Sequence, residues 1–107
     1  MADAMLFFAA REVALGLYDT DHGSGLYKKR IAVVSGRGKS GGARTLLVWN
    51  RSDRVVFLFG FKKNQRDSVS KSALKPFKAI AKLINSFSEN ELALAVKEGE
   101  LYRVTET

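Results

Sequence analysis

The chain has 107 residues, of which 46% are hydrophobic and 27% are charged, and Lys and Arg outnumber Asp and Glu by 18 to 11. This composition predicts a single folded domain over residues 1–107 and is too apolar for a disordered chain. With no Cys and one His, the sequence excludes a disulfide scaffold and thiolate chemistry, and it predicts neither a metal site nor a cofactor.

The N-terminal region is predicted to form an amphipathic helix from Ala4 to about Leu17, with Asp3 as its N-cap. Its longest apolar stretch is too short to span a bilayer, and Asp3 stands where a secretion signal would carry Lys or Arg. We therefore expect a soluble, cytoplasmic protein with no membrane partner. Turn-forming residues follow over 19–25, and His22 among them is expected to be a loop residue and not a catalyst.

Three strands are predicted next, over residues 26–34, 43–50 and 54–61. The third strand is apolar on both faces, so it should lie in a sheet that is largely covered on both sides. Because the connections are too short for crossover helices, an antiparallel meander is the simplest topology.

A helix is predicted from Ser70 or Ser72 to about residue 87. Pro76 is tolerated best in a first turn, which favours the later start or a kinked first turn. Ser88 and Glu91 then have the spacing of a capping box, which predicts a short second helix.

The excess of positive charge lies in one segment of the chain. Residues 26–66 contain eleven basic residues and one acidic residue, a net charge of +10, whereas the rest of the chain has a net charge of −3. A polyanion is expected to bind where such charge is concentrated. The alternative is that these Lys and Arg side chains are solvated and serve solubility.

The glycine-rich segment 36–44 contains Gly-Lys-Ser but does not fit a nucleotide-binding P-loop. That motif needs a glycine where Val33 stands, and it needs a helix after the loop, where this sequence predicts a strand. Two interpretations stay open: a loop that only connects two strands, and a hairpin that projects Arg37 and Lys39 over a backbone phosphate.

Further cations should converge near this loop. Lys28 and Arg30 share one face of a strand, and Arg44 begins the next strand. In an antiparallel meander the exit of the third strand, residues 62–66, approaches Arg44. Such a cluster can hold a phosphate and stabilise the charge that develops when a phosphodiester breaks. It can equally be a static binding patch, because no carboxylate or histidine is an obvious general base.

Three motifs in a fixed order carry a resemblance to a known family. They are Leu-Tyr-Lys-Lys-Arg-Ile-Ala at 26–32, Gly-Lys-Ser-Gly-Gly-Ala-Arg-Thr-Leu at 38–46 and Phe-Gly-Phe-Lys-Lys-Asn-Gln-Arg-Asp at 59–67. Together they resemble the RelE/ParE superfamily of toxins from bacterial type II toxin–antitoxin systems, specifically its HigB-like branch. The resemblance runs from about Tyr18 to Glu100.

The resemblance implies an α+β, RelE-like fold, in which a twisted antiparallel sheet of three or more strands packs against helices. Relatives usually begin earlier, with a first strand and helix that are expected to be missing here. Their absence would expose a sheet edge, through which a homodimer could form.

The resemblance also implies a metal-independent, ribosome-dependent endoribonuclease, or mRNA interferase, which inhibits translation. In this reaction the RNA 2′-hydroxyl attacks the adjacent phosphodiester of mRNA on the ribosome. A cognate antitoxin, expected to be of the helix-turn-helix type, would cover the basic face.

Matched by position, five residues would form the catalytic set: Lys28, Arg30, Arg44, Lys63 and Arg66. One of Lys28 or Arg30 would be the base, and Arg44 would hold the phosphate. Lys63 or Arg66 would be the acid or would stabilise the leaving oxygen. Four more residues are expected to bind RNA phosphates: Lys29, Arg37, Lys39 and Lys62.

Other functions stay open beside this one. The chain could be a shortened, inactive relative that binds RNA, the ribosome or an antitoxin without cleavage. It could also be chiefly an interaction protein that uses the sheet edge, or a relative of the gyrase-directed toxins in the same superfamily.

Overall fold

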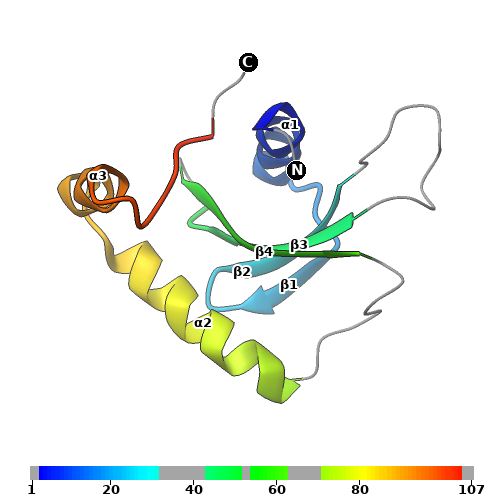
Figure 1. The fold of residues 1–107 in the computed structure, drawn as a ribbon. Helices are drawn as coiled ribbons and strands as arrows, with labels where there is room; N and C mark the ends of the chain where they lie inside the picture. Colours follow the sequence, from blue (N-terminus) through cyan, green and yellow to red (C-terminus); the bar gives the residue numbers. More distant parts are fainter. Residues whose placement is uncertain (1–2, 32–42, 52–53, 63–70, 105–107) are drawn as a thin grey trace.

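The structure is a computed structural model that describes residues 3–31, 43–51, 54–62 and 71–104. Within these ranges the chain forms three helices and one antiparallel sheet of four strands in the order β1-β2-β3-β4 (Figure 1). The α+β class and the antiparallel meander are therefore confirmed. The helices are α1 (Asp3–Ala14), α2 (Lys71–Ser86) and α3 (Glu89–Lys97), and the strands are β1 (Thr20–Gly23), β2 (Leu26–Ile31), β3 (Ala43–Trp49) and β4 (Val55–Lys62).

Helices cover both faces of the sheet, with α1 on one face and α2 on the other (Figure 1). The first core cluster joins β2 and β3 to α2, and its buried members are Leu26, Leu46, Val48, Leu74, Ala81 and Ile84. The second joins the same strands to α1 through Val13, Tyr27, Leu47 and Trp49. Because neighbours along a strand point to opposite faces, Leu26, Lys28 and Arg30 lie on the α2 face.

A bulge in β4 changes which face its side chains occupy. Leu46 pairs with Phe59, but Leu47 pairs with Phe57, so Leu58 is the extra residue. Phe57 therefore packs with the α1 cluster, whereas Phe59 lies across from Leu46 on the α2 face. In the described part of the chain, β4 pairs only with β3 and so lies at an edge of the sheet.

The segment around His22 forms strand β1 and not the predicted turn. The Asp19 N–H donates to the Lys28 carbonyl at 2.8 Å, and Thr20 pairs with Lys28 in the ladder. The turn is confined to residues 23–25, where all three residues have positive φ angles. Two closely spaced glycines allow so short a turn that the residues before it can join the sheet.

Helix α1 ends earlier than predicted, at Ala14. Gly16 has a φ of 87°, and the Leu17 N–H donates to the Glu12 carbonyl at 2.9 Å, as in a Schellman C-cap. Leu17 is therefore outside the helix and 54% exposed.

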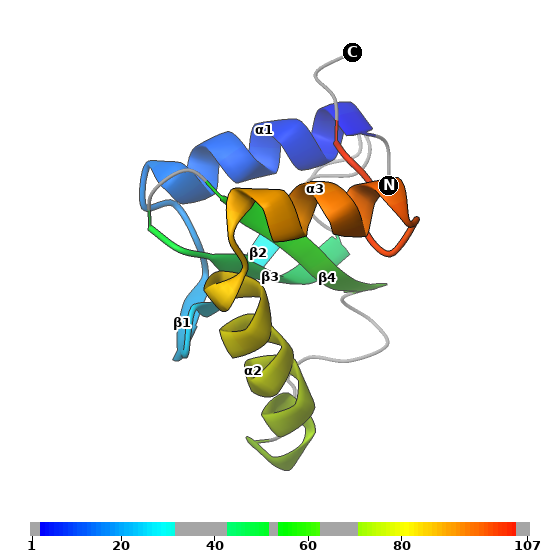
Figure 2. The same cartoon turned by 90° about the vertical axis from the view of Figure 1, so that its left-hand side faces the viewer.

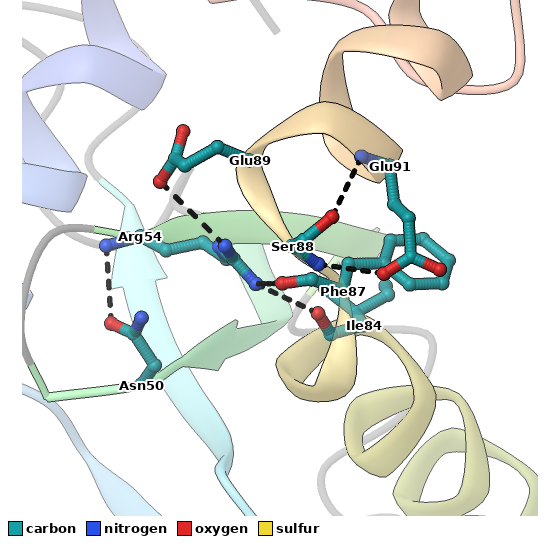
Figure 3. A network of polar contacts seen from close by, with 7 residues as sticks. All are labelled: Asn50, Arg54, Ile84, Phe87, Ser88, Glu89 and Glu91. Carbon is teal, nitrogen blue, oxygen red and sulfur yellow. Dashed lines mark hydrogen bonds and ion pairs between the residues drawn. The ribbon is translucent and has the colours of Figure 1, made fainter.

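The two C-terminal helices match their predicted positions, with one difference. Pro76 is the sixth residue of α2 and lies inside the helix, not in its first turn, and the buried stripe of α2 offsets the cost. The capping box of α3 is confirmed, because Ser88 Oγ accepts from the Glu91 N–H at 3.1 Å and Glu91 Oε1 accepts from the Ser88 N–H at 2.8 Å (Figure 3). No helix in the described ranges is long and apolar enough to cross a membrane.

Candidate phosphate-binding site

Two arginines lie directly opposite each other on the α2 face of the sheet. Arg30 of β2 pairs with Arg44 of β3 in the ladder, which places their Cβ atoms about 5 Å apart. Lys28 lies two residues before Arg30 and therefore on the same face. Like charges in directly opposed positions repel each other, so this arrangement favours an anion that binds between them. Lys28, Arg30 and Arg44 form what we call the basic face.

The guanidinium of Arg44 has unused hydrogen-bonding capacity. Its Nη1 atom is buried and has no hydrogen-bond partner among the described residues. A buried N–H without an acceptor costs free energy, and a phosphate oxygen would supply the acceptor with matching charge and geometry. Arg44 is therefore well suited to hold a phosphate.

Aromatic rings lie beside the basic face. Phe61 is the β4 partner of Arg44, and its ring stacks on that of Phe59 with centroids 5.8 Å apart. The Phe59 ring also meets Phe77 of α2 at 5.6 Å and remains 39% exposed. Since unpaired RNA bases stack on such rings, Phe59 can support a nucleotide whose phosphate lies at Arg44. Sequence reasoning missed these residues because the β4 bulge decides their face.

Helix α2 brings further positive charge to the same side. Lys75, Lys78 and Lys82 follow helical spacing along one flank, and Asn85 continues it. A Cβ atom on Gly25 would clash with the Asn85 side chain, so this flank faces the turn between β1 and β2. Sequence reasoning passed over these lysines, although their spacing and the lack of any acid in residues 68–88 were visible signals.

His22 lies on the same side of the sheet. Burial lowers its pKa below the usual 6.5, and the positive charges of Lys28 and Lys78 lower it further, against a smaller opposing effect of Asp21. The imidazole is therefore neutral at pH 7.

Lys29, in contrast, is on the opposite face from Lys28 and Arg30. Its side chain is only 9% exposed, and its Nζ atom lies 3.1 Å from Glu12 Oε1 of α1. Arg51 and Arg54 also make internal contacts: Arg51 lies over the Trp49 ring and near Asp21, and Arg54 holds the end of α2. The structure thus separates Lys29 from the basic face, and we leave it out of the proposed RNA site.

Replacing Glu12 with Ala is expected to destabilise the protein by about 2 kcal/mol, because it leaves the buried Lys29 ammonium without its partner. Urea unfolding would measure this loss. The double variant Glu12→Ala, Lys29→Met should recover most of it, since an apolar side chain of similar length fills the same place. A Lys29→Met variant that bound RNA as weakly as an Arg44 variant would contradict this structural role.

The remaining predicted site residues are not placed. Arg37, Lys39, Lys63 and Arg66 lie outside the described residues. Lys62 ends β4 opposite Ala43, and only its backbone position is described.

A separate cleft of about 760 Å³ lies between α1, the start of β4, α3 and residues 100–104. None of its lining residues belongs to the basic face. Across the placed segments of the chain, no three His, Asp or Glu side chains gather as metal ligands.

Two comparisons with known proteins had different outcomes. A comparison with curated proteins found no match. The family model described as the RelE toxin of the RelE/RelB toxin–antitoxin system matches residues 1–104. This match covers nearly the whole chain, including all four strands and the three residues of the basic face. The chain therefore belongs to the RelE family of toxins from toxin–antitoxin systems.

Proposed function

We propose that this toxin belongs to the HigB-like branch and is a ribosome-dependent mRNA endoribonuclease that works without a metal ion. The observation that carries the proposal is the direct opposition of Arg30 and Arg44 on a face where Arg44 Nη1 is buried and has no hydrogen-bond partner in the described part of the chain. In the free protein the repulsion between Arg30 and Arg44 costs free energy, and so does a buried N–H of Arg44 that has no acceptor among the described residues. A bound phosphate would offset both costs, because it supplies negative charge and an acceptor oxygen.

The proposed reaction is transfer of the RNA phosphate to the neighbouring 2′-oxygen. The 2′-hydroxyl loses a proton, its oxygen bonds to phosphorus, and the bond from phosphorus to the 5′-oxygen breaks. Arg44 and Arg30 would bind the non-bridging oxygens, where negative charge builds up in the transition state. Preorganised donors of this kind lower the barrier because they need no reorientation as the charge forms.

The proton transfers need separate groups. Arginine stays protonated in proteins, so Arg30 is the poorer of the two candidates for the base. Lysine can exchange its proton where arginine cannot, so Lys28 is the candidate that we favour as the base. For the 5′-oxygen we propose Lys63 or Arg66, by their position in the third motif, as the group that gives it a proton or stabilises its negative charge.

The proposal is tested by adding the purified protein to a translating extract and mapping the ends of a defined mRNA. We expect cuts only in mRNA that is being translated, with a 2′,3′-cyclic phosphate on one side and a 5′-hydroxyl on the other. The same mRNA without ribosomes should stay intact. Intact mRNA in the translating extract would contradict the proposal.

The second candidate function is an inactive relative that binds RNA or an antitoxin without cleavage. The same basic face favours it, because a patch of cations binds phosphate whether or not chemistry follows. Binding that weakens steeply as salt rises, together with uncut mRNA, would select this function. The partner shared by both candidates is the antitoxin with which RelE toxins pair, for which we propose a helix-turn-helix type.

A further inference from the structure

Three lysines of α2 share one flank of the helix, which we call the lysine flank. At 3.6 residues per turn, Lys75, Lys78 and Lys82 fall within about 60° of each other around the helix axis. The other flank is apolar, although Ile80 and Leu83 are exposed there. Lysines that served only solubility would be expected on both flanks of an exposed helix. Their one-sided placement is what a negatively charged ligand on that side requires.

Helix α2 passes over the sheet at the level of the basic face. The Phe77 ring meets the Phe59 ring of β4, with centroids 5.6 Å apart. Phe59 pairs with Leu46, and Leu46 pairs with Lys28, so these three residues lie side by side across the sheet. Lys78 follows Phe77 in the helix. The middle of the lysine flank is therefore level with Lys28.

The lysine flank is also the side of α2 that faces β1 and β2. Asn85 continues the row of lysines along the helix, and its side chain lies against Gly25 in the turn between these two strands. Burial lowers the pKa of His22 in β1, and the positive charges of Lys28 and Lys78 lower it further. Both ammonium groups therefore lie near the same imidazole, so the lysine flank adjoins the basic face.

In the described part of the chain, no ion pair involves the lysine flank. The ion pairs found there use Lys29, Arg51 and Arg54, and residues 68–88 contain no Asp or Glu. The Asp21 carboxylate, which also acts on His22, is engaged by Arg51 Nη2 at 3.4 Å. The positive charges of the lysine flank and the basic face therefore add, and such a field attracts a polyanion.

We propose that the lysine flank binds backbone phosphates of the same mRNA strand that the basic face holds, an inference that rests on the proposed function. A strand whose reacting phosphate lies at Arg30 and Arg44 passes Lys28 and continues along the flank. From Lys75 to Lys82 the helix advances about 10 Å, the length of about three phosphates in a stacked strand. Contacts with phosphates position the strand and do not read its bases.

The test is the binding of a 2′-O-methylated oligouridine, which cannot be cut, followed by fluorescence anisotropy at several salt concentrations. The triple variant Lys75→Gln, Lys78→Gln, Lys82→Gln should bind a strand of about 12 nucleotides about 100-fold more weakly at ~0.1 M salt. The slope of log affinity against log salt should shrink by about 2, because each phosphate contact on a single strand contributes about 0.7.

A shorter strand shows whether this loss belongs to the lysine flank. An oligouridine of about 3 nucleotides covers only the basic face, so the triple variant should bind it within about 2-fold of the wild type. Retained binding of the short strand also shows that the variant is folded. An unchanged affinity and salt slope for the long strand, beside this retained binding, would overturn the proposal.

A matched control removes the same charge elsewhere, with Arg11→Gln, Lys97→Gln and Arg103→Gln. All three side chains are exposed, Arg11 and Arg103 line the cleft beside α1 and α3, and Lys97 is in the last turn of α3. This control should bind the long strand within about 2-fold of the wild type. A loss equal to that of the lysine-flank variant would overturn the proposal, because net charge alone would then explain it.

Ribosomal RNA carries the same phosphates, and a second measurement separates it from mRNA. Ribosomes without mRNA should bind the lysine-flank variant as well as they bind the wild type. Weaker binding to these ribosomes, together with an unchanged affinity for the long oligouridine, would overturn the assignment to mRNA and favour ribosomal RNA.

The proposed function and the role of the lysine flank fail on different measurements. Wild-type protein that binds the long oligouridine but never cuts translated mRNA would overturn the proposed nuclease. Normal cleavage by the wild type, with the same affinity and salt slope for the wild type and the lysine-flank variant, would overturn only the role of the flank.

Discussion

Replacing both Lys28 and Arg44 with Gln should reduce mRNA cleavage by about 1,000-fold in a translating extract. Arg44 is proposed to stabilise the charge that appears on the phosphate in the transition state, and Lys28 to take the proton of the 2′-hydroxyl; loss of one such group typically costs a factor of about 100 or more. Primer extension on a defined mRNA would measure the rate. Arg44→Gln alone should account for the larger part, because the buried Nη1 of Arg44 has no other acceptor among the described residues.

The same substitutions should leave the fold intact. Arg44 lies opposite Arg30, and removing one of two opposed like charges relieves repulsion of about 0.2–1 kcal/mol. The double variant should therefore unfold at the same or a slightly higher urea concentration than the wild type. Lys97→Gln, an exposed charge change in the last turn of α3, serves as the matched control and should cleave normally. Equal cleavage by the control and the double variant would remove the basic face from the reaction.

Replacing Arg54 with Met should cost about 3 kcal/mol of the free energy of unfolding. Arg54 Nη1 donates to the carbonyls of Ile84 and Phe87, each at 2.9 Å, and so satisfies two groups where the chain leaves α2 (Figure 3). Methionine fills similar space but leaves both partly buried carbonyls without this donor. Urea denaturation followed by circular dichroism would measure the loss.

The surrounding contacts provide the control for Arg54. Its Nη2 atom lies 3.8 Å from Glu89 Oε1, but the Glu89 side chain is 81% exposed. Glu89→Gln should therefore change stability by less than about 0.5 kcal/mol, as expected for an exposed ion pair. A similarly small loss for Arg54→Met would show that the two carbonyls find water instead, and that Arg54 does not hold α2 in place.

The parts of the fold with local signals could be predicted from the sequence. The capping box of Ser88 and Glu91 marks the start of α3, because its two hydrogen bonds lie within four residues. The placement of Lys28 and Arg30 on one strand face follows from the period of two. The meander follows from short connections, and the order of the strands confirms it.

Features that depend on contacts between distant elements could not be predicted in this way. Lys29 looks like Lys28 in sequence, and only the position of Glu12 on α1 shows that it is paired and buried. The face of Phe59 depends on a bulge that no local residue pattern announces. His22 sits among turn-forming residues, and its place in β1 becomes clear only when its neighbours Asp19 and Thr20 are seen against Lys28.

Figure 2 shows how the elements around the basic face are arranged, with α2 below the sheet and α1 above it. The two sides of the sheet differ in the residues that they carry. Lys28, Arg30, Arg44 and Lys78 gather on the α2 side, whereas the cleft beside α1 and α3 is lined mostly by apolar residues. RNA is therefore expected on the α2 side.

The most direct test of this expectation is to titrate isotope-labelled protein with a short RNA whose 2′-hydroxyls are methylated, so that it binds without being cut. The amide NMR signals of Lys28, Arg30 and Arg44 should shift, together with that of Phe59. The signals of α1 and α3 should stay where they are. Shifts confined to α1 and α3, with none on the basic face, would contradict an RNA site on this side of the sheet.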